Sequence, residues 1–176
     1  MRGSGRGRWV KGQFDSCFYN RVSVSLFSQV PGDPLGLVRL FASPERFCSR
    51  LDEFMLRGAL HPSNFMPDVG YWAGKEPDIL APWLFVFAGC PHHTQYWTRW
   101  LVEHKYSTAP DGIPGNDDYG TMSAWLLFAS LGFYPLSGAP FYIVGSPSLQ
   151  VRDIGVCTCV VALLHFFVRT IHSHCT

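Results

Sequence analysis

The sequence has few charged side chains and no excess of either sign. Only 15% of its 176 residues are Asp, Glu, Lys or Arg, and the formal net charge is +1. Nucleic-acid binding needs a concentrated basic surface, so this composition argues against that class of partner. The early basic residues, between Arg2 and Lys11, lie among glycines. We therefore expect residues 1–17 to be a disordered terminus.

Long apolar runs are also lacking. The segment VCTCVVALLHFFV at 156–168 is shorter than the roughly 20 residues that a membrane helix needs, and it contains His165. The first residues show no apolar stretch of the kind found in signal peptides. We expect no membrane span, interpret residues 151–176 as an apolar tail, and leave the compartment open.

Metal-binding cysteine patterns are absent as well. Six cysteines are present, and they lack zinc-ribbon spacing: Cys17, Cys48, Cys90, Cys157, Cys159 and Cys175. Cys157 and Cys159 form a C-x-C pair, not C-x-x-C. The even number permits disulfides, but a chain of this size does not depend on them. Disulfide pairing stays open. The histidines near Cys175 are interpreted as tail residues, because no zinc-type spacing is present.

Apolar residues, by contrast, make up 47% of the chain, enough to build the core of one domain. Ser43, Pro44 and Glu45 form a typical helix start, and Gly58 is expected to end that helix. Further helices are predicted at about 78–88, 92–106 and 119–131, followed by a short strand at 141–144. The pattern indicates a mainly α fold of packed helical hairpins, in a bundle or a toroid.

Acidic residues gather at two helix entrances. Asn116, Asp117 and Asp118 precede an apolar helix, and Glu76 precedes another. An Asp there serves as a helix N-cap, or as a carboxylate that activates water or holds a cation. Adjacent carboxylates repel, so we expect a shifted pKa in at least one of them. Paired carboxylates across a cleft are what glycoside hydrolysis requires.

Several segments resemble glycoside hydrolase family 92. They are, in the family's order, VPGDPLGLVRLFASPERFCSRLDEF at 30–54, GKEP at 74–77, GIPGNDDYGTMSAWLLFASLGFYPL at 112–136 and YIVGSP at 142–147. The resemblance runs over residues 18–150, which we expect to be part of that family's catalytic domain. It implies part of an (α/α)6 toroid and a calcium-dependent exo-α-mannosidase that inverts the anomeric centre of N-glycan-type mannosides.

The same resemblance assigns roles to single residues. It makes Asp118 the catalytic base, with Asp117 and Glu76 as further catalytic carboxylates. It places Asn116, Asp33, Lys75 and Asn20 in positions that contact the α-mannoside. Metal ligands remain unassigned.

The chain departs from the family where the chemistry is expected. Asn20 stands where the family has the glutamate that we take as the general acid, Gly32 replaces a histidine, and Lys75 replaces an asparagine. An ammonium group near a calcium site opposes the cation, so we expect Lys75 to weaken calcium binding or to pair with Glu76 or Asp118. Three interpretations stay open: an active α-mannosidase, an inactive fragment or relative that binds a glycan or a protein, and a helical interaction module that shares only the fold. The family's N-terminal β-sandwich has no counterpart here. A toroid that lacks several of its helices exposes apolar faces, so we expect instability or association.

Overall fold

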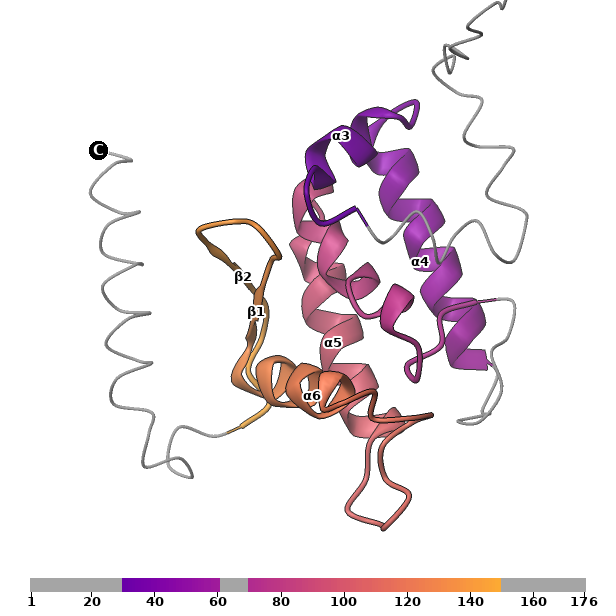
Figure 1. The fold of residues 1–176 in the computed structure, drawn as a ribbon. Helices are drawn as coiled ribbons and strands as arrows, with labels where there is room; N and C mark the ends of the chain where they lie inside the picture. Colours follow the sequence, from indigo (N-terminus) through magenta and orange to yellow (C-terminus); the bar gives the residue numbers. More distant parts are fainter. Residues whose placement is uncertain (1–29, 61–69, 150–176) are drawn as a thin grey trace, which may run out of the picture.

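The computed structural model describes residues 30–60 and 70–149, and this part of the chain is mainly helical (Figure 1). The elements are α3 Pro34–Arg39, α4 Pro44–Leu60, η1 Glu76–Asp78, η2 Ala81–Ala88, α5 Pro91–Lys105, α6 Thr121–Leu131, β1 Phe133–Pro135 and β2 Tyr142–Val144. The predicted fold class is therefore confirmed at the level of mainly α. The predicted terminus at 1–17, Asn20 and the tail at 151–176 lie outside the described residues.

Helix α4 begins as predicted but runs further. The backbone N–H of Arg46 donates to the Ser43 hydroxyl at 3.2 Å, which is the expected N-cap. The prediction that Gly58 ends this helix is wrong, because α4 continues to Leu60. Gly58 serves close packing instead: a Cβ there would lie 2.0 Å from the backbone oxygen of Tyr71.

The helix predicted at 78–88 consists of two 3-10 segments, η1 and η2. Pro82 lies in the first turn of η2, where an α-helix also tolerates proline, so it does not by itself account for the 3-10 geometry. Gly89 ends η2 in the left-handed region, with φ 77°. Helix α6 starts at Thr121, two residues later than predicted, because Asp118 and Tyr119 adopt positive φ.

The hairpin after α6 was predicted only in its second strand. Strand β1 pairs antiparallel with β2, with Tyr134 opposite Ile143. Helix α3 was also not predicted. In Figure 1, α5 lies between α4 and the β hairpin, and α6 crosses the lower part of the molecule.

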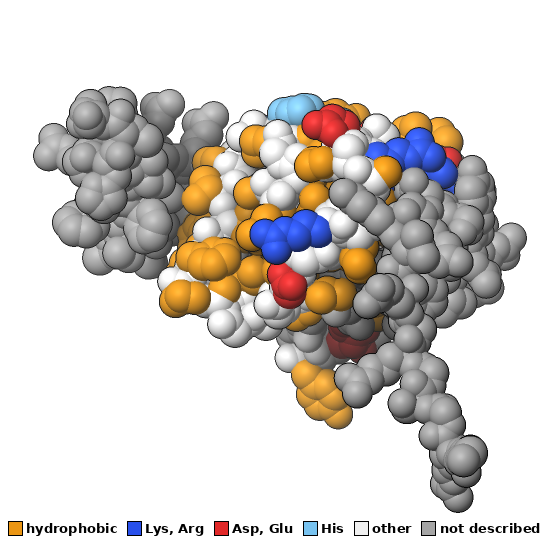
Figure 2. All heavy atoms as spheres, turned by 90° about the horizontal axis from the view of Figure 1, so that it is seen from above, with side chains coloured by type: hydrophobic (Ala, Val, Ile, Leu, Met, Phe, Trp, Pro, Cys, Tyr) orange, Lys and Arg blue, Asp and Glu red, His pale blue; other side chains and the backbone are white. Residues whose placement is uncertain are grey.

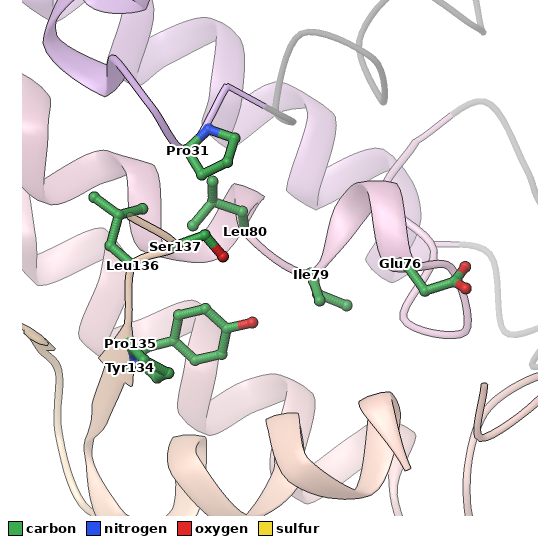
Figure 3. Close-up of a pocket in the computed structure, with 8 residues that line it drawn as sticks. All are labelled: Pro31, Glu76, Ile79, Leu80, Tyr134, Pro135, Leu136 and Ser137. Atoms are coloured by element: carbon green, nitrogen blue, oxygen red, sulfur yellow. The ribbon is translucent and has the colours of Figure 1, made fainter. Parts of the chain in front are cut away.

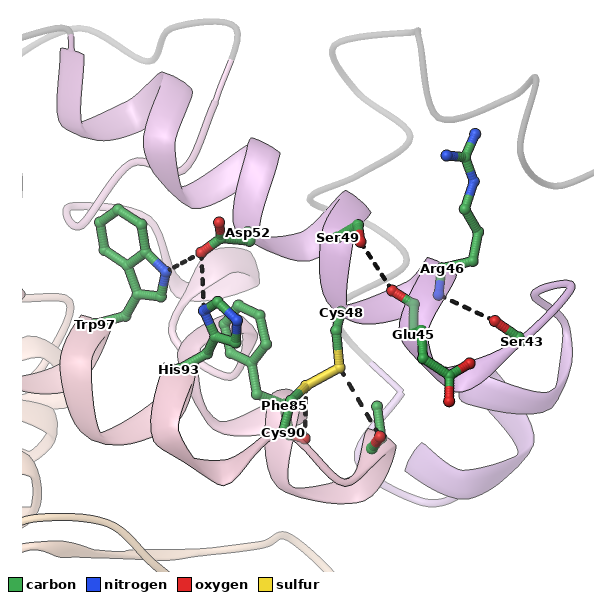
Figure 4. Close-up of a disulfide and its surroundings, with 11 residues drawn as sticks. Ser43, Glu45, Arg46, Cys48, Ser49, Asp52, Phe85, Cys90, His93 and Trp97 are labelled. Carbon is green, nitrogen blue, oxygen red and sulfur yellow. Dashed lines mark hydrogen bonds and ion pairs between the residues drawn. A yellow bond between two sulfur atoms is a disulfide. The ribbon is translucent and has the colours of Figure 1, made fainter.

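The core forms where η2 packs against α3, α4 and α5. Its largest fully buried side chains include Trp83, Trp125, Phe41, Phe85 and Met55. A disulfide between Cys48 and Cys90 joins α4 to the start of α5 (Figure 4). Beside it, the Asp52 carboxylate accepts from the Trp97 indole at 2.7 Å and lies 3.1 Å from Nδ1 of His93. These contacts fix the two long helices to each other.

The surface carries few charges, as the composition indicates. Figure 2 shows one face on which hydrophobic side chains are interspersed with isolated charged ones. Exposed hydrophobic side chains include Leu60, Leu127 and Tyr142. Within the described residues, no helix is both long and apolar enough to cross a membrane.

Candidate functional site

The loop that enters α6 has an unusual backbone. Asp118 and Tyr119 have φ values of 46° and 57°, in the left-handed region that non-glycine residues seldom occupy. The Asn116 side chain accepts from the N–H of Asp118 at 3.1 Å, and the Thr121 hydroxyl donates to the Asp118 carbonyl at 2.7 Å. Backbone conformations of this kind persist only where surrounding contacts hold them, and they cluster at functional sites.

Asp117 lies three residues before Gly120, the N-cap of α6, and its side chain bonds to the first turn of that helix. Its Oδ1 accepts from the backbone N–H of Ser123 at 2.9 Å and from the Ser123 hydroxyl at 2.7 Å. The hydroxyl bond is the first cause that lowers the pKa of Asp117, followed by the backbone bond. The N-cap role that the sequence offered for an Asp falls to Gly120, but the Asp117 carboxylate is still held at the helix start.

The pKa of the Asp118 carboxyl group is shifted in the opposite direction. Partial removal from water is the first cause that raises the pKa of its carboxyl group, and a hydrogen bond with Glu76 and the negative charge of Glu76 raise it further. Asp118 is half-buried, and Glu76 is exposed. The structure thus brings together two acids that lie 42 positions apart in the sequence. A shifted pKa was expected in this loop from the adjacent carboxylates, but Glu76 contributes more to it than Asp117 does.

Two glycines allow the acidic segments to meet. A Cβ at Gly74 would lie 2.8 Å from the carbonyl oxygen of Pro114, and a Cβ at Gly115 would lie 2.7 Å from that of Gly74. Side chains at either position would push the two loops apart. A further link is the Trp125 indole, which donates to the Ile79 carbonyl at 2.9 Å. The backbone contact places Glu76 beside Asp118.

Glu76 also borders a cavity of about 370 Å³ (Figure 3). The cavity has mostly apolar walls and three polar side chains, and its lining is Pro31, Glu76, Ile79, Leu80, Tyr134, Pro135, Leu136 and Ser137. Ligand sites commonly combine apolar walls with a few polar groups that fix orientation. Asp118 touches Glu76 but does not line the cavity. Sequence reasoning did not single out Tyr134 or Ser137.

The remaining predicted contact residues have other surroundings. The Asp33 carboxylate accepts from the N–H of Gly36 at 2.7 Å and caps α3, while its neighbour Pro31 reaches the cavity. Lys75 is half-buried just before η1. Among the residues that the structure describes, no ion pair joins Lys75 to Glu76 or Asp118.

The described residues do not by themselves form a calcium site. Calcium takes six to eight oxygen ligands, and within the described ranges no group of three or more His, Cys, Asp or Glu side chains is arranged to hold a metal ion. The Asn116 side-chain oxygen is already engaged with the loop backbone.

Comparison with known proteins assigns the chain to a family. The model of the glycosyl hydrolase family 92 catalytic domain matches residues 5–158. The chain is 30% identical over 125 residues to an "uncharacterized secreted glycosidase" of Arthroderma benhamiae, an alignment that covers 71% of this chain and 15% of the relative.

Solved structures agree. The family GH92 α-mannosidase BT3965 of Bacteroides thetaiotaomicron, in complex with mannoimidazole, matches with a TM-score of 0.60 and 34% identity, over 71% of this chain and 17% of that one. A structure of BT3965 described without that compound gives a TM-score of 0.59 and 35% identity, over 70% and 16%. The chain thus spans about a sixth of the length of the relatives that it matches.

Proposed function

Because the chain belongs to glycosyl hydrolase family 92, we propose that its described residues carry part of an inverting α-mannosidase site for N-glycan-type α-mannosides. The observation that carries the proposal is the carboxyl pair. Asp118 lies beside Glu76, and Glu76 borders a cavity of suitable volume for a small ligand. The family supplies the reaction class, and the pair supplies a group that can accept a proton.

Asp118 is the base in this proposal. In an inverting glycosidase a carboxylate takes a proton from water, the water oxygen attacks the anomeric carbon, and a separate acid protonates the departing oxygen. The raised pKa of Asp118 makes its carboxylate a stronger proton acceptor than an ordinary Asp. Partial burial and Glu76 together produce this tuning.

Glu76 does not act as the acid opposite Asp118. The two carboxyl groups of an inverting enzyme lie roughly 6.5–9.5 Å apart, so that water and sugar fit between them. Glu76 instead lies near enough to Asp118 to raise the pKa of its carboxyl group. We assign Glu76 the tasks of raising the basicity of Asp118 and of bordering the bound sugar.

A second candidate function is glycan binding without turnover. The resemblance puts Asn20 at the position of the general acid, and an amide cannot deliver a proton there. Lys75 also favours binding without turnover, because it directly precedes Glu76 and its ammonium group opposes calcium. We propose weak calcium binding for this reason. Calorimetric titration of the full chain with calcium checks it, and tight binding would contradict it.

We also propose that the described helices are a segment of an (α/α)6 toroid. Their likeness to the solved α-mannosidase, at a TM-score of 0.60 over 17% of that chain, supports a place within a larger helical domain. The structure of a longer chain would contradict this proposal if α4 and α5 did not pack as one hairpin of such a ring.

The release of mannose from an aryl α-mannoside, with and without calcium, tests the function. If the first candidate holds, we expect turnover that falls by about 100-fold or more in Asp118→Asn, as for loss of a general base. Asp111→Asn is the matched control, because Asp111 is an exposed acid on the preceding loop. Mannoside binding without turnover would select the second candidate. If the chain neither binds nor hydrolyses the mannoside, both candidate functions are overturned.

A further inference from the structure

Tyr134 is held rigidly at the wall of the cavity. It lies on β1, and its ring stacks on that of Trp83 with centroids 5.0 Å apart and planes 15° apart. Trp83 is fully buried, and the Phe128 ring meets Tyr134 edge-on at 6.2 Å. A ring packed on a fixed indole has little freedom to turn away. The sequence has therefore placed an aromatic hydroxyl in a defined position.

The hydroxyl of Tyr134 is available to a ligand. Figure 3 shows it directed into the cavity, on the side toward Ile79. Within residues 30–60 and 70–149, it has no hydrogen-bond partner. Burial raises the pKa of Tyr134 to about 12, so the hydroxyl keeps its proton at any working pH. It is a hydrogen-bond donor held ready at the cavity wall.

The remaining lining defines the ligand class. Pro31, Leu80 and Leu136 offer apolar contact, which suits the C–H faces of a sugar ring. Ser137 adds a second hydroxyl, which can donate or accept. Glu76 borders one end and disfavours an anion such as a phosphate or a uronic acid. A neutral pyranoside satisfies all three conditions.

We propose that Tyr134 is a substrate-binding residue, whose hydroxyl donates a hydrogen bond to a hydroxyl or ring oxygen of a neutral pyranoside seated between Pro31 and Ser137. This rests on the proposed function and adds a specificity-determining group to the same site. Tyr134 takes no part in proton transfer to the water or to the departing oxygen. Its hydrogen bond stabilises the complex with the bound sugar and the transition state to the same extent.

Tyr134→Phe tests the proposal, because Phe keeps the stack on Trp83 and removes only the hydroxyl. With methyl α-mannoside as the probe, we expect binding by the full chain to weaken about tenfold, the effect of one neutral hydrogen bond. If the chain turns over an aryl α-mannoside, KM rises by a similar factor while kcat stays the same. Tyr142→Phe is the matched control, since Tyr142 is an exposed tyrosine on the paired strand.

The outcomes separate the two proposals. Wild-type binding that Tyr134→Phe leaves unchanged overturns the role of Tyr134 and leaves the mannosidase site standing. A fall in kcat with constant KM also overturns it, because that pattern belongs to a group acting in the chemical step. Absence of mannoside binding and turnover in the wild type overturns the proposed function itself. The thermal midpoint of the variant is checked alongside, and Ser137→Ala provides a second change on the same wall, expected to weaken binding in the same direction.

Discussion

The two neighbouring aspartates before α6 have pKa values shifted in opposite directions. Asp117 is stabilised as an anion by the hydroxyl and backbone N–H of Ser123, which lower its pKa. Asp118 is destabilised as an anion by partial burial and by Glu76, which raise its pKa. A sequence can show that two acids are adjacent, but the partners that separate their behaviour come from elsewhere in the fold. Ser123 lies one turn into the helix, and Glu76 lies on another loop.

This difference predicts a gain of stability on loss of Asp118. An acid whose pKa is raised by folding contributes stability below its unfolded pKa, and that contribution is lost as the pH rises through the folded pKa. At neutral pH the ionised Asp118 therefore opposes folding. We expect Asp118→Asn to raise the thermal midpoint at pH 7 and to leave it nearly unchanged at pH 3, measured by circular dichroism.

Asp111→Asn serves again as the control and should change neither midpoint. A lower midpoint for Asp118→Asn at pH 7 would contradict the placement of Asp118 beside Glu76.

At the scale of elements, the disulfide joins two helices that carry no part of the carboxyl pair. Cys48 and Cys90 are 42 positions apart and both buried. Closing a loop of that length stabilises a fold by about 3–4 kcal/mol through the entropy of the unfolded chain. We expect a Cys48→Ser and Cys90→Ser double variant to lower the free energy of unfolding in urea by about that amount.

Reduction of the wild-type protein with dithiothreitol is the companion measurement. It should shift the urea midpoint as far as the double variant does, and it should not shift the double variant further. An unchanged midpoint in both experiments would show that the helices are fixed by packing alone.

The elements also show what sequence patterns can and cannot predict. Apolar spacing and end residues gave the location of α4, α5 and α6, because a helix start such as Ser43-Pro44-Glu45 is a local property. The sequence placed Pro82 correctly in the first turn of this segment, but no local pattern distinguished the 3-10 geometry of η2 from an α-helix. The continuation of α4 through Gly58 depends on Tyr71, and so could not be predicted locally. The cavity is built from segments about a hundred residues apart, Pro31 and Tyr134 among them, and no local pattern connects them.

At the scale of the whole molecule, apolar side chains face outward on the hairpin. Tyr142 and Val144 are more than half exposed, and Tyr142 packs edge-on against Phe133 with ring centroids 5.4 Å apart. The chain spans about a sixth of its relatives' length. An outward apolar face of this kind favours association.

We expect the isolated chain to self-associate, with a sedimentation coefficient that rises with concentration. Replacing Tyr142 and Val144 with Ser should shift the onset of association to higher concentration, because β2 then presents less apolar surface. Leu35→Ser on α3, far along the chain, is the control for a general change in solubility. Equal sedimentation of all three proteins would place the association face elsewhere.

The backbone contact between Gly74 and Gly115 determines how this site can be inherited or transplanted. A graft of the acidic loop alone onto another scaffold would carry Asp118 without the neighbour that makes it a strong base. A library that varies the acids and spares the glycines would keep the two loops in register, whereas one bulky residue at position 74 would separate them. The structural unit that makes the carboxyl pair is two touching loops, and neither acidic motif carries it alone.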